Sequence, residues 1–278
     1  MRLGGPIFTP YSDPQSWTLA VRAAGYSAAF CPVDEDADVA IIRGYETAAR
    51  EADIIIAEVG AWSNPLSPDP AISGPALEHC QRQLALADEI GACCCVNIVG
   101  SRGAKWDGPS AEDLMPETFD LIVEVTRAII DAVKPTRSFW TLETMPWMLP
   151  DSADSYLALV QAIDRERCAV HFDPVNLVNC PRRYFFTGDL LRECFAKLGP
   201  QMKSCHAKDI RLADNLTTHL DEVRPGTGNL DYTVFLSEAA KLQPDLPIML
   251  EHLPNEDEYT AAAEYVKGVG EAAGLEWK

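Results

Sequence analysis

Residues 169–173 read Ala-Val-His-Phe-Asp, an apolar run of strand length that ends in a carboxylate. The same pattern, a short apolar run closed by an ionisable side chain, recurs three times in the C-terminal half of the chain, at Ser138–Glu143, Met202–His206 and Pro247–Glu251. Short apolar runs separated by longer helix-like stretches are typical of buried parallel strands. These four segments therefore predict strands of a parallel sheet with helices between them.

Four earlier apolar runs extend the same alternation to the N-terminus. They are Leu3–Phe8, Ala28–Pro32, Asp53–Val59 and Cys93–Val99. Helices are expected after each strand, beginning at Asp13-Pro14 and Asp151 and spanning Asp38–Arg50, Ser73–Ile90, Ala111–Val133, Gly188–Leu198, Tyr232–Leu242 and Glu256–Ala273. Asp-Pro at a helix start and Gly91 directly after a helix end are residues that helix caps prefer.

Eight strand–helix units without a long linker predict an α/β fold, a single (β/α)8 barrel domain over residues 1–278. An open doubly wound sheet is the alternative. That fold normally carries a glycine-rich phosphate-binding turn after an early strand, and neither GxGxxG nor GxxxxGKS occurs in this chain. The barrel is therefore the favoured prediction.

The composition limits the partners and the compartment. A formal net charge of -19 disfavours nucleic acids and anionic membranes, because both need a basic surface. No apolar stretch approaches the roughly 20 residues of a membrane helix, and no signal peptide is recognisable, so we expect a cytoplasmic protein. The chain has nine cysteines but no CxxC pair, which indicates reduced, mostly buried thiols and no structural zinc site.

Ionisable residues end four consecutive predicted strands. In (β/α)8 barrels the C-terminal ends of the strands form the active site, so these side chains are expected to meet at one mouth. They are Glu143, Asp173, His206 and Glu251. Converging carboxylates repel one another unless a cation lies between them. Three oxygen ligands and one imidazole suit Mn²⁺, Mg²⁺ or Co²⁺ better than structural Zn²⁺. Surface charges or salt bridges at the strand ends are the alternative for each residue.

These residues lie in segments that resemble the xylose isomerase-like TIM-barrel superfamily of sugar isomerases and epimerases, and within it the ketose 3-epimerase branch. The resemblance is carried by Leu142-Glu143-Thr144, His171–Asn176, His206–Asp209, Arg224–Gly228 and Leu250–His252. It implies one divalent metal ion, with Mn²⁺ expected and Mg²⁺ or Co²⁺ as alternatives, bound by the four strand-end residues. The superfamily also contains endonuclease IV, but the small number of histidines, five, and the negative charge disfavour that branch.

The resemblance also implies roles for single residues. Glu143 and Glu251 become the acid and base that move the proton through an enediolate intermediate. Substrate contacts are expected from side chains near the same mouth, namely Arg224, Lys208, Asn176, Trp106 and Trp147. Loop packing or a salt bridge is the alternative for these side chains. The epimerase branch usually has histidine where this chain has Asn176, and glutamate where it has Leu149.

Several further residues are weaker candidates. Glu58 and Asn97 end the third and fourth predicted strands. Each is expected to hydrogen-bond either to substrate hydroxyls or to a neighbouring loop. His171 is interpreted as a partner of a metal ligand or as a buried, satisfied histidine. Trp62 is expected to pack in its loop, with stacking on the substrate as the alternative, and a second metal at Asp209 is not favoured.

Three functions remain open at this point. The first is isomerisation or epimerisation of a small sugar or sugar phosphate. The second is dehydration of an inosose- or dehydroshikimate-like substrate on the same scaffold. The third is a non-catalytic metal- or sugar-binding barrel. A small carbohydrate is the expected partner in each case, and relatives suggest a homodimer or homotetramer.

Overall fold

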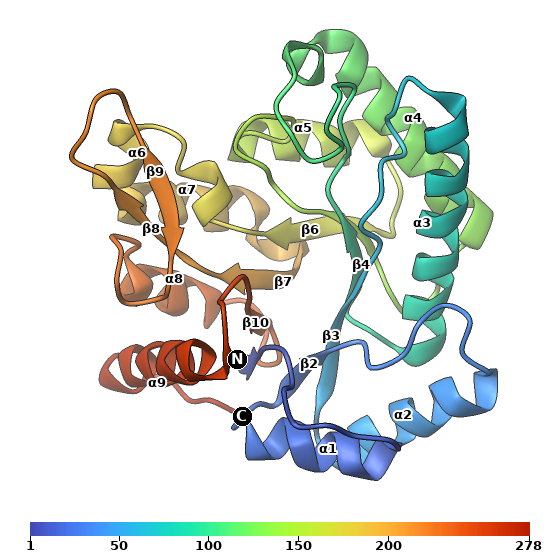
Figure 1. Cartoon of the computed structure of the whole chain (residues 1–278), viewed down its shortest axis with the longest axis vertical. Helices are drawn as coiled ribbons and strands as arrows, with labels where there is room; N and C mark the ends of the chain where they lie inside the picture. Colours follow the sequence, from blue (N-terminus) through green and yellow to red (C-terminus); the bar gives the residue numbers. More distant parts are fainter.

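Eight parallel strands close into a barrel in the computed structural model, which describes residues 1–278 (Figure 1). The strands are β1 (Arg2–Gly4), β2 (Ala28–Phe30), β3 (Ile55–Gly60), β4 (Cys94–Asn97), β5 (Trp140–Leu142), β6 (Cys168–Phe172), β7 (Met202–Ala207) and β10 (Pro247–Leu250). Strand β10 pairs with both β7 and β1, which closes the sheet. The predicted (β/α)8 barrel is confirmed, and the open doubly wound sheet is excluded.

Helices surround the barrel and connect consecutive strands (Figure 1). The longer ones are α1 (Pro14–Ala23), α2 (Val39–Glu51), α3 (Pro70–Ile90), α4 (Pro116–Val133), α5 (Ala153–Ile163), α7 (Thr187–Leu198), α8 (Tyr232–Ala239) and α9 (Glu256–Ala272). The N-terminal caps follow the sequence: the Asp13 side chain accepts from the Ser16 amide, and Ser152 accepts from the Ser155 amide. The C-terminal residue Lys278 hydrogen-bonds to Met1, so the termini lie side by side.

The structure corrects two predicted helices and adds elements that the sequence did not predict. The expected helix Ala111–Val133 is split, because Met115 is extended before Pro116, as residues preceding proline usually are. Helix α3 begins at Pro70 instead of Ser73, because Asp69 caps it. A short helix α6 (Pro181–Phe185) and an antiparallel hairpin of β8 (Asp209–Leu212) and β9 (Leu220–Val223) were not predicted. The hairpin lies outside the barrel (Figure 1).

No helix in the structure is both long enough and apolar enough to cross a membrane. All nine cysteines are free thiols.

The barrel interior is polar toward the C-terminal ends of the strands. Glu58 on β3 contacts His171 on β6 and His206 on β7, although β3 is not a neighbour of either strand. Such contacts can only cross the inside of the barrel. Buried polar groups are stable only when they are paired, so this interior layer must be satisfied by its own members or by a bound cation.

Candidate metal centre

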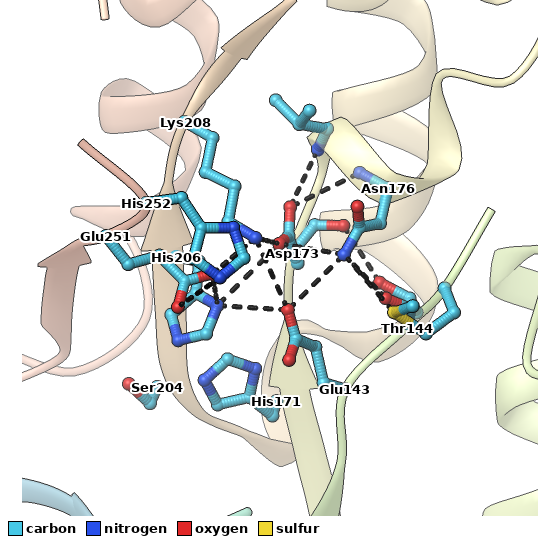
Figure 2. Close-up of polar contacts among 12 residues, drawn as sticks. Glu143, Thr144, His171, Asp173, Asn176, Ser204, His206, Lys208, Glu251 and His252 are labelled. Carbon is cyan, nitrogen blue, oxygen red and sulfur yellow. Dashed lines mark hydrogen bonds and ion pairs between the residues drawn. The ribbon is translucent and has the colours of Figure 1, made fainter. Parts of the chain in front are cut away.

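The four predicted ligands converge on one point at the barrel mouth (Figure 2). Glu143, Asp173 and Glu251 directly follow β5, β6 and β10, and His206 lies within β7. The Nδ1 atom of His206 lies 2.8 Å from Glu251 Oε1, 3.2 Å from Glu143 Oε1 and 3.6 Å from Asp173 Oδ2. The strand ends therefore bring together three carboxylates and one imidazole, as the fold prediction required.

The electrostatics of this cluster suit a cation. Burial alone would raise the pKa of Glu251, but His206 and Lys208 beside it lower that pKa to about 2. Burial alone would lower the pKa of His206, but the surrounding carboxylates, above all Glu251 and Glu58, raise it well above its usual value. Glu251 thus stays ionised and provides a negative charge in a cluster whose members are almost completely buried.

The donor set fits one divalent ion. Glu251 Oε1 is buried and accepts no hydrogen bond of regular geometry, although the cationic groups of His206 and Lys208 lie beside it. An ion whose metal–ligand bonds are roughly 2.1 Å long needs oxygen and nitrogen ligand atoms that lie about 3 Å from one another. The cluster also lacks sulfur ligands, so a hard or borderline cation is favoured.

Backbone amides close to Asp173 in the sequence orient its carboxylate. Its Oδ1 accepts hydrogen bonds from the amides of Val175 (3.0 Å) and Asn176 (3.3 Å) in the turn that follows β6. The other oxygen, Oδ2, is left to face the cluster. Asn176 adds a second support, because its side-chain amide donates to Asp173 Oδ2 (3.1 Å) and Glu143 Oε1 (3.3 Å). Asn176 therefore orients two predicted ligands as well as lining the cavity.

Lys208 is buried inside the cluster. It is two residues beyond His206, so both side chains point to the same side of the chain. Its Nζ lies 2.8 Å from Asp173 Oδ2 and also contacts Glu251, and its side chain is 1% exposed. Burial alone would lower its pKa, but Asp173, Glu143 and the neighbouring carboxylates raise it well above its usual value. Lys208 is therefore a permanent positive charge beside the predicted ligands.

The Asp209 carboxylate accepts hydrogen bonds from the loop that contains Gly226 and Gly228, and it has no oxygen free for a second metal. Its Oδ1 accepts from the amides of Ile210 and Leu230, and its Oδ2 accepts from the amides of Gly226 and Gly228. The turn comes close enough that a Cβ on Gly228 would lie 2.4 Å from Asp209 Oδ1. The motif Arg224–Gly228 is thus folded around a buried carboxylate.

Replacing Asp209 by asparagine is expected to lower the free energy of unfolding by about 2–3 kcal/mol, because an amide nitrogen would face two of these backbone donors. Urea denaturation of the metal-free protein measures the loss, with the exposed turn variant Thr227→Ala as the control. A variant of unchanged stability that binds less metal would instead identify Asp209 as a ligand.

A cavity of about 570 Å³ opens above the cluster. Glu143, Asn176, Lys208 and Glu251 line its floor, and Trp62, Trp106 and Trp147 line its wall. The Trp147 indole donates to the Asp107 carbonyl (3.2 Å), which joins the loops that follow β4 and β5. Trp106 and Trp147 therefore lie where substrate contacts were predicted. Trp62, for which loop packing was favoured over substrate stacking, lies there too.

Other candidates lie elsewhere or carry other contacts. Arg224 is not among the cavity residues, and its Nε forms an ion pair with Glu258 Oε2 on α9 (2.9 Å). Asn97 makes the loop hydrogen bonds that were its alternative, with Ser63. His252 was not proposed from the sequence but lines the cavity, with its Nδ1 3.2 Å from Glu222. Its only sequence signal was its place directly after Glu251.

A second buried group lies beneath the cluster. Glu58 Oε2 lies 3.0 Å from His171 Nε2 and 3.3 Å from His206 Nε2, and Glu58 Oε1 accepts from Ser204 Oγ (3.0 Å). Burial alone would raise the pKa of Glu58, but His171 and His206 hold it below its usual value. Glu58, a weak candidate from the sequence, is therefore part of an internal network of hydrogen bonds, and it is also among the residues that line the cavity.

Comparisons with known proteins agree with the fold. The family model described as "Xylose isomerase-like TIM barrel" matches residues 19–269. The chain matches no curated protein.

Similar solved structures span nearly the whole chain. A D-psicose 3-epimerase with D-tagatose from Clostridium cellulolyticum H10 has 14% identity and a TM-score of 0.67, covering 97% of this chain and 99% of that one. A magnesium complex of a xylose isomerase-like TIM barrel protein from Mycobacterium smegmatis has 17% identity and a TM-score of 0.66, covering 94% and 90%. A probable 3-DHS dehydratase from Bacillus anthracis has 16% identity and a TM-score of 0.70, covering 96% and 99%. At such identities these likenesses establish the fold alone.

Proposed function

The chain belongs to the xylose isomerase-like TIM barrel family, and from that premise we propose that it is a divalent-metal-dependent isomerase or epimerase of a small, unphosphorylated sugar. The observation that carries the proposal is the convergence of Glu143, Asp173, His206 and Glu251 at the floor of the cavity. When bound there, a divalent cation would polarise a substrate carbonyl and hydroxyl and acidify the adjacent C–H bond.

The chain supplies the groups that move the proton. Glu143 and Glu251 approach the cavity floor from β5 and β10, strands separated by β6 and β7. A sugar carbon held between them presents one face to each carboxylate. One carboxylate can then remove the proton next to the carbonyl, and the other can return a proton to the opposite face. Lys208 supports this exchange by keeping a positive charge beside the carboxylates.

The cavity favours a neutral polyol. Its cationic side chains are already paired: Lys105 with Asp107 (3.1 Å), Lys208 with the ligand carboxylates, and His252 with Glu222. No arginine lines it. Apart from the proposed metal ion, a phosphate group would therefore meet carboxylates without a free counter-charge. The apolar face of a sugar ring, by contrast, can stack on a tryptophan.

The metal, the compartment and the assembly extend the proposal. We propose Mn²⁺ as the ion, with Mg²⁺ or Co²⁺ as alternatives, because the donors are three oxygens and one nitrogen. We also propose a cytoplasmic protein, since all nine thiols are free. A homodimer or homotetramer is proposed from the family alone.

A dehydratase is the second candidate, and the position of Leu149 favours it. Leu149 is packed against the hydrophobic core, where the epimerase branch usually offers a glutamate. A site without that glutamate still has Glu143 and Glu251, either of which can remove a proton. The resulting carbanion can then expel a β-hydroxyl group.

One experiment separates the candidates. The Mn²⁺-supplemented protein is incubated in deuterated water with ketohexoses, their 6-phosphates and inososes. We expect deuterium at an epimerised or isomerised carbon of a free sugar, and at least about tenfold slower exchange with the phosphates, since about 1.4 kcal/mol of charge repulsion suffices for that difference. Loss of water from the inosose would favour the dehydratase. Absence of any reaction in the presence of bound metal would favour a binding protein.

A further inference from the structure

His206 is contacted on both of its ring nitrogens. Its Nδ1 faces the carboxylates of the metal centre, with Glu251 Oε1 at 2.8 Å. Its Nε2 faces the barrel interior, 3.3 Å from Glu58 Oε2. Glu58 approaches from β3 across the barrel, and its side chain is only 1% exposed. The same imidazole thus lies between the predicted metal and a buried carboxylate.

The positions of the protons follow from these contacts. A carboxylate oxygen is a hydrogen-bond acceptor, so an imidazole nitrogen within hydrogen-bond distance of it presents an N–H group, here Nε2 of both His171 and His206. His171 agrees: its Nε2 lies 3.0 Å from Glu58, and its buried Nδ1 has no partner, so a proton there would be left unpaired. His206 faces carboxylates with both ring nitrogens, Nδ1 on the side of Glu251 and Nε2 on the side of Glu58. When a cation binds at the mouth-side carboxylates, a proton on Nε2 leaves the lone pair of Nδ1 free to face it.

We propose that Glu58 is a positioning residue for the metal centre. Glu58 holds the His206 ring with its proton on Nε2 and its Nδ1 lone pair directed at the cation. Ser204 and His171 fix Glu58 in turn, through its Oε1 and Oε2 respectively. The inference rests on the proposed metal-dependent function. A carboxylate behind a ligating imidazole orients the ring and raises its basicity, and losing such a partner typically weakens metal binding by about 10- to 100-fold.

A second ion is the competing explanation of the same contacts. Glu58, His171 and His206 offer three donor atoms within 4.8 Å of one another. An ion there would need His206 to lose both ring protons and bridge two cations. A hydrogen-bonded Glu58 needs no such deprotonation, and it accounts for the 3.0 Å and 3.3 Å contacts directly. The number of ions bound per chain distinguishes the two explanations.

The test compares Glu58→Met, Glu58→Gln and the control Ser204→Ala in the full-length protein. Methionine removes the acceptor and keeps an unbranched side chain of the same length. Glutamine keeps an oxygen that can face His206 and an amide that can face Ser204, so it removes only the charge. Ser204→Ala removes a partner of Glu58 but leaves the contact with His206 intact. The dissociation constant and stoichiometry for Mn²⁺ are measured from the electron paramagnetic resonance signal of the free ion.

We expect the dissociation constant to rise about 10- to 100-fold in Glu58→Met, less in Glu58→Gln, and little in Ser204→Ala. Nuclear magnetic resonance of the Mg²⁺-loaded wild type should also show a downfield, exchange-protected Nε2 proton on His206, which disappears in Glu58→Met. A purely structural role would not remove that signal selectively, and with five histidines in the chain the assignment is tractable.

The outcomes separate the inference from the function on which it rests. Unchanged affinity and an unchanged Nε2 proton in Glu58→Met would overturn the role of Glu58 and leave the metal site standing. Two ions per chain in the wild type, reduced to one in Glu58→Met, would overturn it in favour of the second ion. A wild type that binds no Mn²⁺ would overturn the proposed function and this inference with it.

Discussion

Glu251→Gln is expected to lower the rate of deuterium exchange into substrate by about 10³-fold or more. A glutamine amide cannot accept or return a proton, and a positioned acid or base contributes about 10²- to 10⁴-fold. The same change removes a negative donor that lies 2.8 Å from His206 Nδ1, so metal binding is weakened as well. Exchange is measured at saturating Mn²⁺ together with the bound metal content, so that loss of the ion and loss of the proton carrier are distinguished.

Glu222→Gln is the matched control. Glu222 also lines the cavity, but its carboxylate faces His252 and lies 3.8 Å from Lys208 instead of contacting His206. Its rate is expected to stay within about tenfold of the wild type, the range of a lost polar contact. Glu143→Gln is expected to behave like Glu251→Gln. If both variants bound metal and kept more than about a tenth of the wild-type rate, these glutamates would not be the acid–base pair.

The sequence was sufficient to predict the barrel and the convergence of its strand ends. Each strand is a short apolar run, and a charged residue directly after such a run lies where the chain leaves the core. Once the sheet is assumed to close, the C-terminal strand ends must surround one mouth of the barrel. The four strand-end residues therefore meet there, namely Glu143, Asp173, His206 and Glu251. The predicted strand Ser138–Glu143 was too long, yet this did not matter, because Glu143 only needs to follow β5.

The features that the sequence did not predict depend on contacts between distant residues. Glu58 meets His171, 113 positions later, and nothing near Glu58 identifies that partner. Arg224 was expected to contact substrate, but helix α9 brings Glu258 next to its guanidinium. The β8–β9 hairpin has strands of only four residues, and their burial pattern is irregular, so no period-2 signal distinguishes them from a loop.

Lys208→Met is expected to destabilise the metal-free protein by about 3–5 kcal/mol, the usual effect of removing one partner from a buried ion pair. Methionine keeps an unbranched side chain only one atom shorter than that of lysine, so the effect is mainly one of charge. Asp173 and Glu251 would keep only His206 as a buried counter-charge. A divalent cation held by the same carboxylates would replace the missing charge. The free energy of unfolding is measured by urea denaturation with a chelator and with saturating Mg²⁺.

The difference between wild type and Lys208→Met should therefore shrink when metal is added. Any ion that binds only the folded state stabilises it, by about 4 kcal/mol at a thousand times the dissociation constant, and the variant has more repulsion for the ion to relieve. Lys105→Met is the control, because Lys105 is 72% exposed and its pair with Asp107 should contribute at most about 1 kcal/mol. An equal loss of stability with and without metal would show that Lys208 acts through packing. In that case its charge would not be what balances the carboxylates, and the link between Lys208 and the metal centre would fail.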